Sequence, residues 1–253
     1  MRKKLAAQLF TLRNEVKRDF PGTLKELKQM GWAGVQIDGL HGYDPREISG
    51  VMKEFGLQAA GMHVGLERMK HDLEAVLEEG RLFGTKDMIC HSLPVQLQNE
   101  PGYRAVRNDL LDISKKVSPL GYRVGYHNHD FEFHTSVDGR YALDYLLEPD
   151  LESPIFAEID TYWVKKAKVD PLSYIKAYSN RMPILHLKDM TLDESSYFTE
   201  IGNGVIDFAP IIRWGEANGV EWYAVEQDYC PGSPMESLAV SFENLMRIST
   251  EVE

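Results

Sequence analysis

One junction recurs along the chain: an amphipathic stretch ends at a glycine, and a short apolar run follows at once. Glycine is preferred just past the end of a helix, because it reaches positive φ without the steric cost of a Cβ atom. Each junction therefore predicts a helix, a stop and a strand, and their repetition predicts alternating helices and strands. The junction glycines are Gly31, Gly56, Gly84, Gly121 and Gly219.

The predicted helices also carry start signals. In Thr23–Glu26 and Asp44–Glu47 a capping side chain stands three residues before a Glu, and Pro45 occupies a first-turn position that needs no N–H donor. Asp170–Pro171 and Asp207 open two further helical stretches. The apolar runs between the helices lack a sustained polar face, which is typical of strands covered on both sides.

These junctions predict eight strands, which begin near Leu5, Ala33, Leu57, Lys86, Tyr122, Pro154, Met182 and Val220. Eight units in 253 residues give about 32 residues each, and about 250 residues is typical of a (β/α)₈ barrel. A doubly wound open sheet is the main alternative, but Phe10–Thr23 lacks the G-x-G-x-x-G that brings backbone N–H groups to a pyrophosphate. No linker divides the chain, so we predict an α/β fold, a single TIM-barrel domain over residues 1–253.

Charge and composition exclude several classes of protein. Asp+Glu number 39 against 28 Lys+Arg, a net charge of −11, whereas nucleic-acid proteins need clustered basic residues. The longest uncharged stretches, 55–66 and 88–99, have 12 residues each, fewer than the ~20 that span a bilayer. The N-terminal apolar run has no signal-peptide cleavage site, and Cys90 and Cys230 are too few for a disulfide framework. We expect a cytoplasmic protein without nucleic-acid or membrane partners; its oligomeric state is open, a homo-oligomer included.

Reactive side chains end the predicted strands. In a (β/α)₈ barrel the site lies at the carboxyl ends of the strands. In strand order these side chains are Gln8; Gln36 and Asp38; His63; His91; His127, His129 and Glu132; Glu158 and Asp160; His186 and Lys188; and Glu226.

Three of these residues, Asp160, His186 and Glu226, would converge from the last three strands. Burying them without a shared ligand would be costly. Mixed oxygen and nitrogen ligands suit one divalent ion such as Mn²⁺, Co²⁺, Mg²⁺ or Zn²⁺, and the absence of thiolates disfavours a structural zinc site. The sequence therefore predicts a metal site, on the assumption that the fold is a barrel.

Other residues keep structural alternatives. A histidine at the end of a strand is often only hydrogen-bonded, so His63 and His91 are either structural or substrate-binding. Trp163 is either a core residue or a wall on which a sugar ring stacks. The segment Gly202–Gly204 lies where barrels often hold phosphate, but we interpret it as a turn and do not assume a phosphorylated substrate.

The strand-end motifs resemble the sugar phosphate isomerase/epimerase group of the xylose-isomerase-like TIM-barrel superfamily, whose members include ketose 3-epimerases, inosose dehydratase and endonuclease IV. The motifs are Gln8–Arg13, Tyr126–Phe133, Glu158–Trp163, Leu185–Met190, Ile201–Gly204 and Val225–Asp228. Each motif is short, but together they span nearly the whole chain. The resemblance implies a barrel with one divalent ion held by Glu, Asp, His and Glu from strands five to eight.

In that pattern Asp160, His186 and Glu226 take the last three ligand places. The first place departs from the family, because relatives commonly carry Glu-Asn-His where this chain has His127–His129. Either Glu132 swings in from the loop or the first His substitutes for the missing Glu, and we expect Glu132.

The resemblance implies an isomerase or epimerase that removes a proton next to the carbonyl of a keto sugar through a metal-stabilised enediolate. The catalytic candidates are His127, His129, Lys188 and Glu226, with Lys188 stabilising negative charge on oxygen. The substrate-binding candidates are Gln8, His63, His91 and Trp163.

Two other functions stay open. A lyase or dehydratase acting on a 3-keto sugar or inosose is the first alternative, because the chain has more imidazoles than a two-carboxylate epimerase requires. A noncatalytic sugar-binding barrel is the second. An endonuclease is disfavoured by the net charge of −11. In every case the expected partner is a small sugar.

Overall fold

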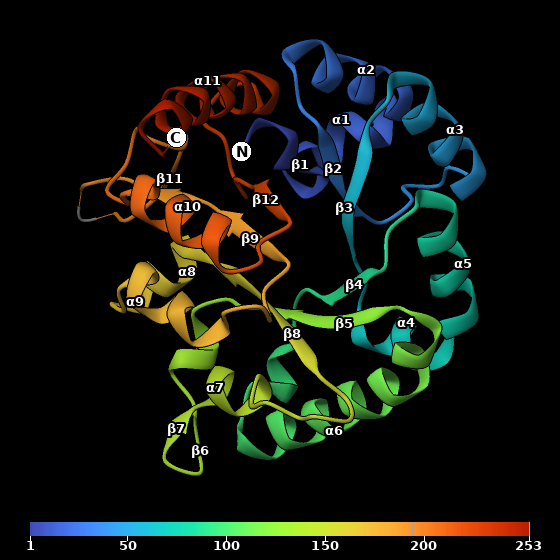
Figure 1. Cartoon of the computed structure of the whole chain (residues 1–253), viewed down its shortest axis with the longest axis vertical. Coiled ribbons are helices and arrows are strands. Elements are labelled where there is room, and N and C mark those ends of the chain that lie inside the picture. Colours follow the sequence, from blue (N-terminus) through green and yellow to red (C-terminus); the bar gives the residue numbers. More distant parts are fainter. Residues whose placement is uncertain (194, 253) are drawn as a thin grey trace.

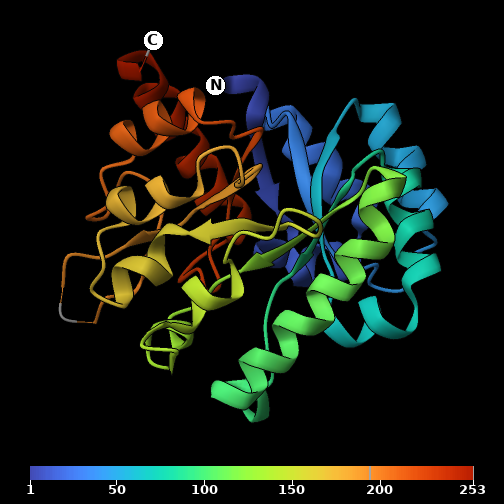
Figure 2. The same cartoon turned by 60° about the horizontal axis from the view of Figure 1, so that its bottom comes forward.

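The computed structural model describes residues 1–193 and 195–252, and at its centre eight parallel strands close into a barrel with helices outside it (Figures 1 and 2). The order around the ring is β1, β12, β9, β8, β5, β4, β3 and β2. The bounds of these strands are β1 (Leu5–Gln8), β2 (Gly34–Asp38), β3 (Gln58–His63), β4 (Asp87–Cys90), β5 (Arg123–His127), β8 (Ile155–Asp160), β9 (Ile184–Leu187) and β12 (Trp222–Val225). The predicted barrel is confirmed, and each strand begins within two residues of its predicted start.

Helices cover the outer surface of the ring. They are α1 (Arg13–Arg18), α2 (Phe20–Met30), α3 (Pro45–Phe55), α4 (Leu66–His71), α5 (Leu73–Phe83), α6 (Glu100–Val117), α7 (Ala142–Leu146), α8 (Thr161–Lys166), α9 (Pro171–Ile175), α10 (Phe208–Ala217) and α11 (Pro234–Val252). Short 3-10 helices span Arg2–Lys4, Leu9–Leu12, Val95–Leu97, Ser118–Leu120, Phe131–Phe133 and Lys176–Tyr178. Within the described ranges, none of the helices combines the length and the apolar character that a membrane crossing requires.

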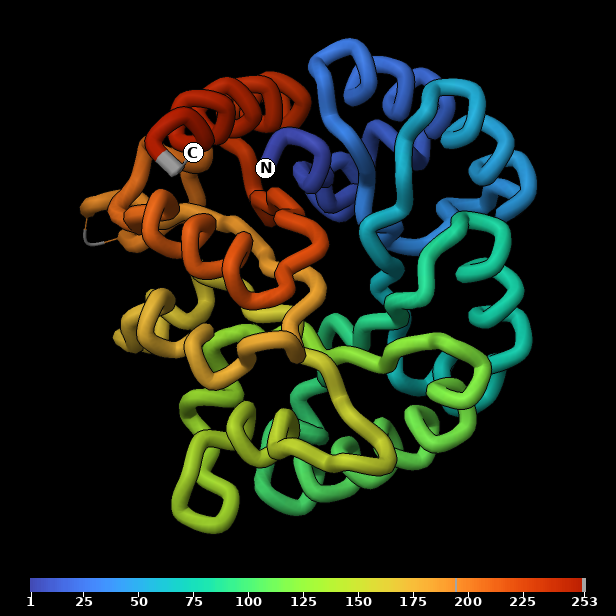
Figure 3. The backbone as a smooth tube through the Cα atoms, in the orientation of Figure 1, coloured from blue at the N-terminus to red at the C-terminus, as the bar shows by residue number. Residues whose placement is uncertain are grey.

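Two short β-hairpins lie at the carboxyl end of the barrel. They pair β6 (Ser136–Val137) with β7 (Arg140–Tyr141), and β10 (Asp189–Met190) with β11 (Phe198–Thr199). The chain travels once around the barrel, so that the C-terminal helix α11 lies beside the N-terminal segment (Figure 3). Phe242 of α11 also packs on Trp32, which lies between α2 and β2, with ring centroids 5.0 Å apart.

The junction glycines adopt the conformation that the sequence predicts. Their φ angles lie between 64° and 109°, at Gly31, Gly56, Gly84, Gly121 and Gly219. The start of α3 is also as predicted, because the Asp44 side chain accepts a hydrogen bond from the backbone N–H of Arg46. Asp170 and Asp207 cap α9 and α10 in the same way.

The predicted start of α2 is wrong. This helix begins at Phe20, and its N-cap is Asp19, whose side chain accepts from the backbone N–H of Gly22. Thr23 lies inside the helix, where its hydroxyl donates to the backbone carbonyl of Asp19 at 2.7 Å. An Asp with a proline in the first turn provides a complete start signal four residues earlier, so the Thr-x-x-Glu pattern is not used as a cap.

The barrel interior changes from apolar to polar along the strands. Ile89, Ile184 and Ala224 form a small buried cluster of their own. Ile184 and Ala224 stand two residues before His186 and Glu226, so these side chains share the inward face of their strands. The apolar layer therefore forms a floor beneath polar side chains at the carboxyl end.

Candidate metal centre and active site

Four barrel strands bring polar side chains together at their carboxyl ends. His127 ends β5, Asp160 ends β8, His186 lies in β9 and Glu226 directly follows β12. Each offers one ligand atom, and these atoms all lie within 4.8 Å of one another. All four side chains are buried. We call these residues the metal group; it contains the three residues that the sequence analysis placed together.

The donor set of the metal group fits a divalent ion. Asp160 Oδ2 and His186 Nδ1 are buried and have no hydrogen-bond partner among the described residues, although the Lys188 ammonium lies 3.3 Å from Asp160 Oδ2. His186 Nδ1 lies 3.4 Å from Glu226 Oε2, and His127 Nε2 lies 3.9 Å from Asp160 Oδ2. Unpaired buried polar atoms cost free energy, and an ion at this point would satisfy them. Two imidazoles and two carboxylates suit Mn²⁺, Co²⁺ or Zn²⁺.

Glu132 lies outside the metal group, contrary to our expectation, and His127 stands in the strand-five place. Glu132 is fully buried, and its two carboxylate oxygens accept hydrogen bonds from the Tyr126 hydroxyl at 2.6 Å and from the backbone N–H of His129 at 2.9 Å. Burial raises the pKa of Glu132 to about 7, although these hydrogen bonds oppose the shift. The carboxyl group thus holds the loop after β5 in place.

Lys188 supplies positive charge beside the metal group. Its Nζ lies 2.9 Å from Glu226 Oε2, 2.9 Å from Asp228 Oδ1 and 3.3 Å from Asp160 Oδ2. Burial opposes the charged form, but these carboxylates outweigh it and hold the pKa of Lys188 well above its ordinary value. Conversely, Lys188 and His186 hold the pKa of Glu226 well below its usual range in spite of burial. The ammonium and the Glu226 carboxylate are therefore both charged.

A cavity of about 180 Å³ opens at the metal group. It is lined by Phe10, Asp38, His63, His91, Ser92, His127, His129, Glu226 and Asp228. This volume is below the ~300–1,000 Å³ of pockets for drug-sized ligands, so the cavity suits a small molecule. A larger hollow of about 500 Å³ lies beside Lys86 and Trp222, near the amino ends of the strands and away from these side chains.

The predicted substrate-binding residues take different positions. His63 and His91 line the cavity and stack on one another, with ring centroids 5.3 Å apart. Trp163 is not among the residues that line it; its ring packs on that of His129 at 5.1 Å. Burial lowers the pKa of His91 to about 4 and that of His129 to about 3, and Lys188 adds to the shift at His129. Both imidazoles are neutral at pH 7.

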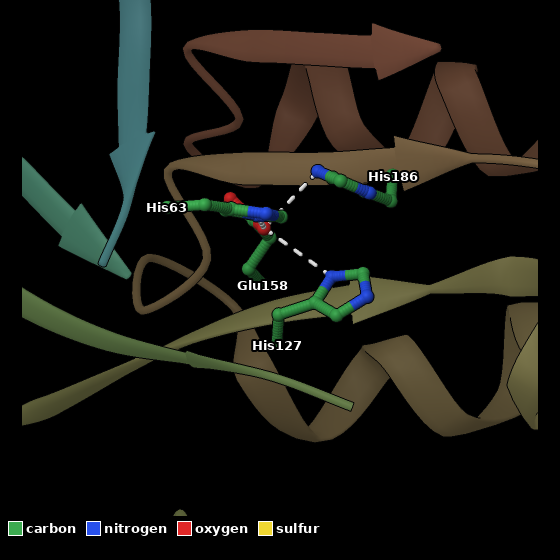
Figure 4. A group of neighbouring side chains, drawn as sticks. All are labelled: His63, His127, Glu158 and His186. Atoms are coloured by element: carbon green, nitrogen blue, oxygen red, sulfur yellow. Dashed lines mark hydrogen bonds and ion pairs between the residues drawn. The ribbon is translucent and has the colours of Figure 1, made fainter. Parts of the chain in front are cut away.

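Glu158 lies at the centre of a second group of polar side chains, for which the sequence predicted no function. It stands two residues before Asp160 in β8, so both carboxylates point into the barrel. Its Oε1 atom is 2.6, 3.0 and 3.3 Å from ring nitrogens of His63, His186 and His127, respectively (Figure 4). The spacing of two within a strand was the signal that could have placed both acids on one face.

Gln8 also faces the barrel interior and not the cavity. It is fully buried, and its Nε2 donates to Gln36 Oε1 at 2.9 Å and to His63 Nδ1 at 3.1 Å. The structure therefore places Gln8 beneath a cavity-lining histidine and not among the residues that line the cavity.

The loop after β9 encloses a carboxylate of its own. Backbone N–H groups of Met190, Gly202, Gly204 and Ile206 donate to the Asp189 side chain at 2.8 to 3.1 Å. Barrels often hold phosphate in this loop. Here the donors that could hold phosphate are already paired, and the segment around Gly202 is a turn.

This enclosure depends on Gly204. A Cβ atom at this position would overlap the carbonyl oxygen of Met190 and the carboxylate of Asp189. We expect Gly204→Ala to lower the free energy of unfolding by about 1–3 kcal/mol, the usual cost of overpacking, as measured by urea denaturation. Gly50→Ala in α3 is the control, because a Cβ atom there meets nothing within 4 Å and should stabilise the helix by up to about 1 kcal/mol. Equal effects of the two changes would contradict this account.

No protein-family model matches the chain. Among solved structures, a sugar phosphate isomerase/epimerase from Parabacteroides distasonis superposes with a TM-score of 0.82 at 20% identity, over 99% of this chain and 96% of that one. A xylose isomerase-like TIM barrel/4-hydroxyphenylpyruvate dioxygenase fusion protein superposes with a TM-score of 0.74 at 14% identity, over 98% of this chain and 43% of that one. The chain therefore has the TIM-barrel fold of these proteins.

This TIM barrel also resembles a zinc-containing structure and a set of curated sequences. The zinc-containing IolI protein superposes with a TM-score of 0.72 at 11% identity, over 99% of each chain. The inosose dehydratase of Clostridium botulinum (strain Alaska E43) is 21% identical over 257 residues, which cover 86% of this chain and 85% of that protein. The inosose dehydratase of Clostridium beijerinckii is 26% identical over 166 residues, and this match spans only 53% of that protein's length.

Proposed function

We propose that this protein is a divalent-metal-dependent dehydratase of a small polyhydroxy ketone, a keto sugar or an inosose. It would remove the proton next to the carbonyl and expel a hydroxyl group as water. The observation that carries the proposal is the convergence of His127, Asp160, His186 and Glu226 at the cavity. An ion bound there would supply Lewis-acid stabilisation of negative charge on the oxygens of the substrate.

The groups at the cavity fit elimination, because the proton that a carboxylate takes from carbon can be returned to the leaving hydroxyl, which then departs as water. Glu226 lines the cavity as an ionised carboxylate and is our candidate for the base. Lys188, 2.9 Å from Glu226, is positioned to keep it ionised and to stabilise negative charge on oxygen. Epimerisation would also need a base on the opposite face, and the strand-five carboxylate of the epimerase pattern is replaced here by His127. The likeness to inosose dehydratases supports the same choice.

The charge of the cavity supports an uncharged substrate. Asp38, Glu226 and Asp228 line it, and no Lys or Arg is among the described residues that do so. A phosphate group would be repelled by these carboxylates, and the backbone N–H groups of the loop after β9 are held by Asp189. We therefore propose an unphosphorylated ketone.

Isomerase or epimerase activity is the second candidate. Asp38 from β2 and Glu226 after β12 line the same cavity, so a second carboxylate is available to a bound ketone. The likeness in fold to the sugar phosphate isomerase/epimerase agrees with this possibility. Both reactions begin with removal of a proton next to the carbonyl.

One experiment separates these functions. The purified protein is stripped of metal, reloaded separately with Mn²⁺, Co²⁺, Mg²⁺ or Zn²⁺, and incubated in D₂O with an inosose, free keto sugars and the matching sugar phosphates. We expect a metal-dependent product that is lighter by one water, from an unphosphorylated ketone, detected by mass spectrometry. A stereoisomer that has gained deuterium would instead establish the second candidate. Binding without any turnover would overturn both and leave a sugar-binding barrel.

A further inference from the structure

A chain of hydrogen bonds beneath the metal group starts at the backbone. The N–H of Phe10 donates to Gln8 Oε1 at 3.1 Å, which fixes the end of the Gln8 amide that carries hydrogens. Gln8 Nε2 then donates to Gln36 Oε1 at 2.9 Å and to His63 Nδ1 at 3.1 Å. Gln36 Nε2 in turn donates to Glu158 Oε2 at 2.5 Å. Each amide therefore has one orientation, set in sequence from the backbone to Glu158.

This chain assigns a hydrogen to one nitrogen of His186. Gln36 Oε1 and Glu158 Oε1 lie 2.6 and 3.0 Å from His186 Nε2. An amide oxygen and a carboxylate only accept hydrogen bonds, so Nε2 must carry the hydrogen. The other nitrogen, Nδ1, faces Glu226 and Asp160 at 3.4 and 3.9 Å. It is the nitrogen that would offer a lone pair to an ion.

The same oxygen, Glu158 Oε1, also lies close to the imidazole rings of His63 and His127. His63 Nδ1 accepts from Gln8, so His63 Nε2 carries the hydrogen that reaches Glu158 Oε1 at 2.6 Å. His127 Nδ1 lies 3.3 Å from that oxygen and has no hydrogen-bond partner among the described residues, so Glu158 is the acceptor nearest to it; its Nε2 faces Asp160 at 3.9 Å. In both His127 and His186, one ring nitrogen therefore faces Glu158 and the other faces the remaining residues of the metal group.

We propose that Glu158 is a positioning residue that fixes the ring orientation and the protonated nitrogen of both imidazole ligands, His127 and His186. This inference rests on the proposed function, because it takes the metal group to bind an ion. Imidazole ligands commonly donate their second N–H to a carboxylate, which orients the ring and strengthens the metal bond. Here one carboxylate oxygen lies beneath both ligand rings, 3.0 Å from His186 Nε2 and 3.3 Å from His127 Nδ1.

A second ion is the competing interpretation. Ligand atoms of His63, His127, Glu158 and His186 also lie within 4.8 Å of one another. However, the 2.6 Å between His63 Nε2 and Glu158 Oε1 is a hydrogen-bond length. Two ligands of one tetrahedral ion stand about 3.3 Å apart, since each lies about 2.0 Å from the metal. The geometry therefore favours hydrogen bonds over a second ion.

The variant Glu158→Gln tests the inference. The glutamine has the same size as the glutamate, but one end of its amide is an NH₂ donor. In either orientation this NH₂ group faces another donor, either the Gln36 NH₂ group or the imidazole N–H groups. We expect the affinity for Zn²⁺, measured by chelator competition, to fall about 10–100-fold. Asp87→Asn is the matched control: Asp87 is a buried strand carboxylate in β4 that pairs with Arg123 at 2.5 Å. Because it lies at the amino end of the barrel, the control should bind Zn²⁺ as the wild type does.

A second measurement needs no variant. In the Zn²⁺-loaded wild type, ¹⁵N NMR of the histidine rings should show a hydrogen on Nε2 of His186 and on Nδ1 of His127. The opposite protonated nitrogens, or unchanged Zn²⁺ affinity in a folded Glu158→Gln, would overturn the inference and leave the proposed function standing. Two ions per chain in the wild type and one in the variant would overturn it in favour of a second metal site. A wild type that binds no divalent ion would overturn the proposed function and this inference together.

Discussion

Replacement of His186 by alanine is expected to abolish stoichiometric binding of a divalent ion and to lower kcat/KM by about 10³-fold or more. The ring nitrogen Nδ1 of His186 is buried and unpaired, 3.4 Å from Glu226 Oε2, and no other described side chain takes its place. A metal ion contributes several kcal/mol of charge stabilisation, and each 1.36 kcal/mol changes a rate tenfold, so a loss of about 10³-fold follows. Metal analysis after dialysis and exchange of solvent deuterium at the carbon next to the carbonyl measure the two effects.

Two further variants provide the control for this prediction and the result that would contradict it. His71→Ala should bind metal and turn over as the wild type does, because the side chain is 72% exposed at the end of α4. Glu226→Gln should match His186→Ala, since it removes a carboxylate of the same group. If His186→Ala and Glu226→Gln both keep full deuterium exchange, the metal-dependent scheme must be abandoned.

Lys188→Met is expected to destabilise the metal-free protein by about 3–5 kcal/mol, the usual cost of removing one partner from a buried ion pair. Lys188 is 1% exposed and is the cation that Asp160, Glu226 and Asp228 share. Without the ammonium group, these carboxylates repel one another, and this repulsion destabilises the folded state. Thermal and urea denaturation in the presence of EDTA measure the loss.

Metal should reverse much of this loss. A divalent ion at the metal group compensates Asp160 and Glu226, so adding Mn²⁺ should raise the Tm of Lys188→Met by more than it raises that of the wild type. Lys116→Met, at an exposed position of α6, should change the stability by no more than about 0.5 kcal/mol. An equal gain from Mn²⁺ in the wild type and in Lys188→Met would show that the ammonium and the ion do not share these carboxylates.

The barrel could be predicted from the sequence because its signals are local. A glycine such as Gly56 ends a helix through its own backbone angles, and Asp44 starts one through a hydrogen bond two residues away. The convergence of three metal-group residues then followed from the fold, because parallel strands bring their carboxyl ends to one side of a barrel. The start of α2 failed where two local signals competed, and Asp19 prevailed over Thr23.

The strand-five residue depended on contacts that no spacing encodes. Glu132 is an acid in the loop that follows β5, as the sequence analysis assumed. Its direction is decided by the Tyr126 hydroxyl and by the backbone N–H of His129, which occupy its two oxygens. The arrangement of Glu158 depends on long-range packing in the same way, since its partners Gln36 and His63 come from other strands.

The enclosed carboxylate of Asp189 bears on how the ligand preference of such a barrel can change. An acidic side chain that fills a cage of backbone amides occupies the donors that would otherwise bind a free anion. Shortening that one side chain would leave the amides without an acceptor and with space in front of them. At this turn a single substitution therefore decides whether the backbone N–H groups hold the chain's own carboxylate or are free to bind an anion from solution.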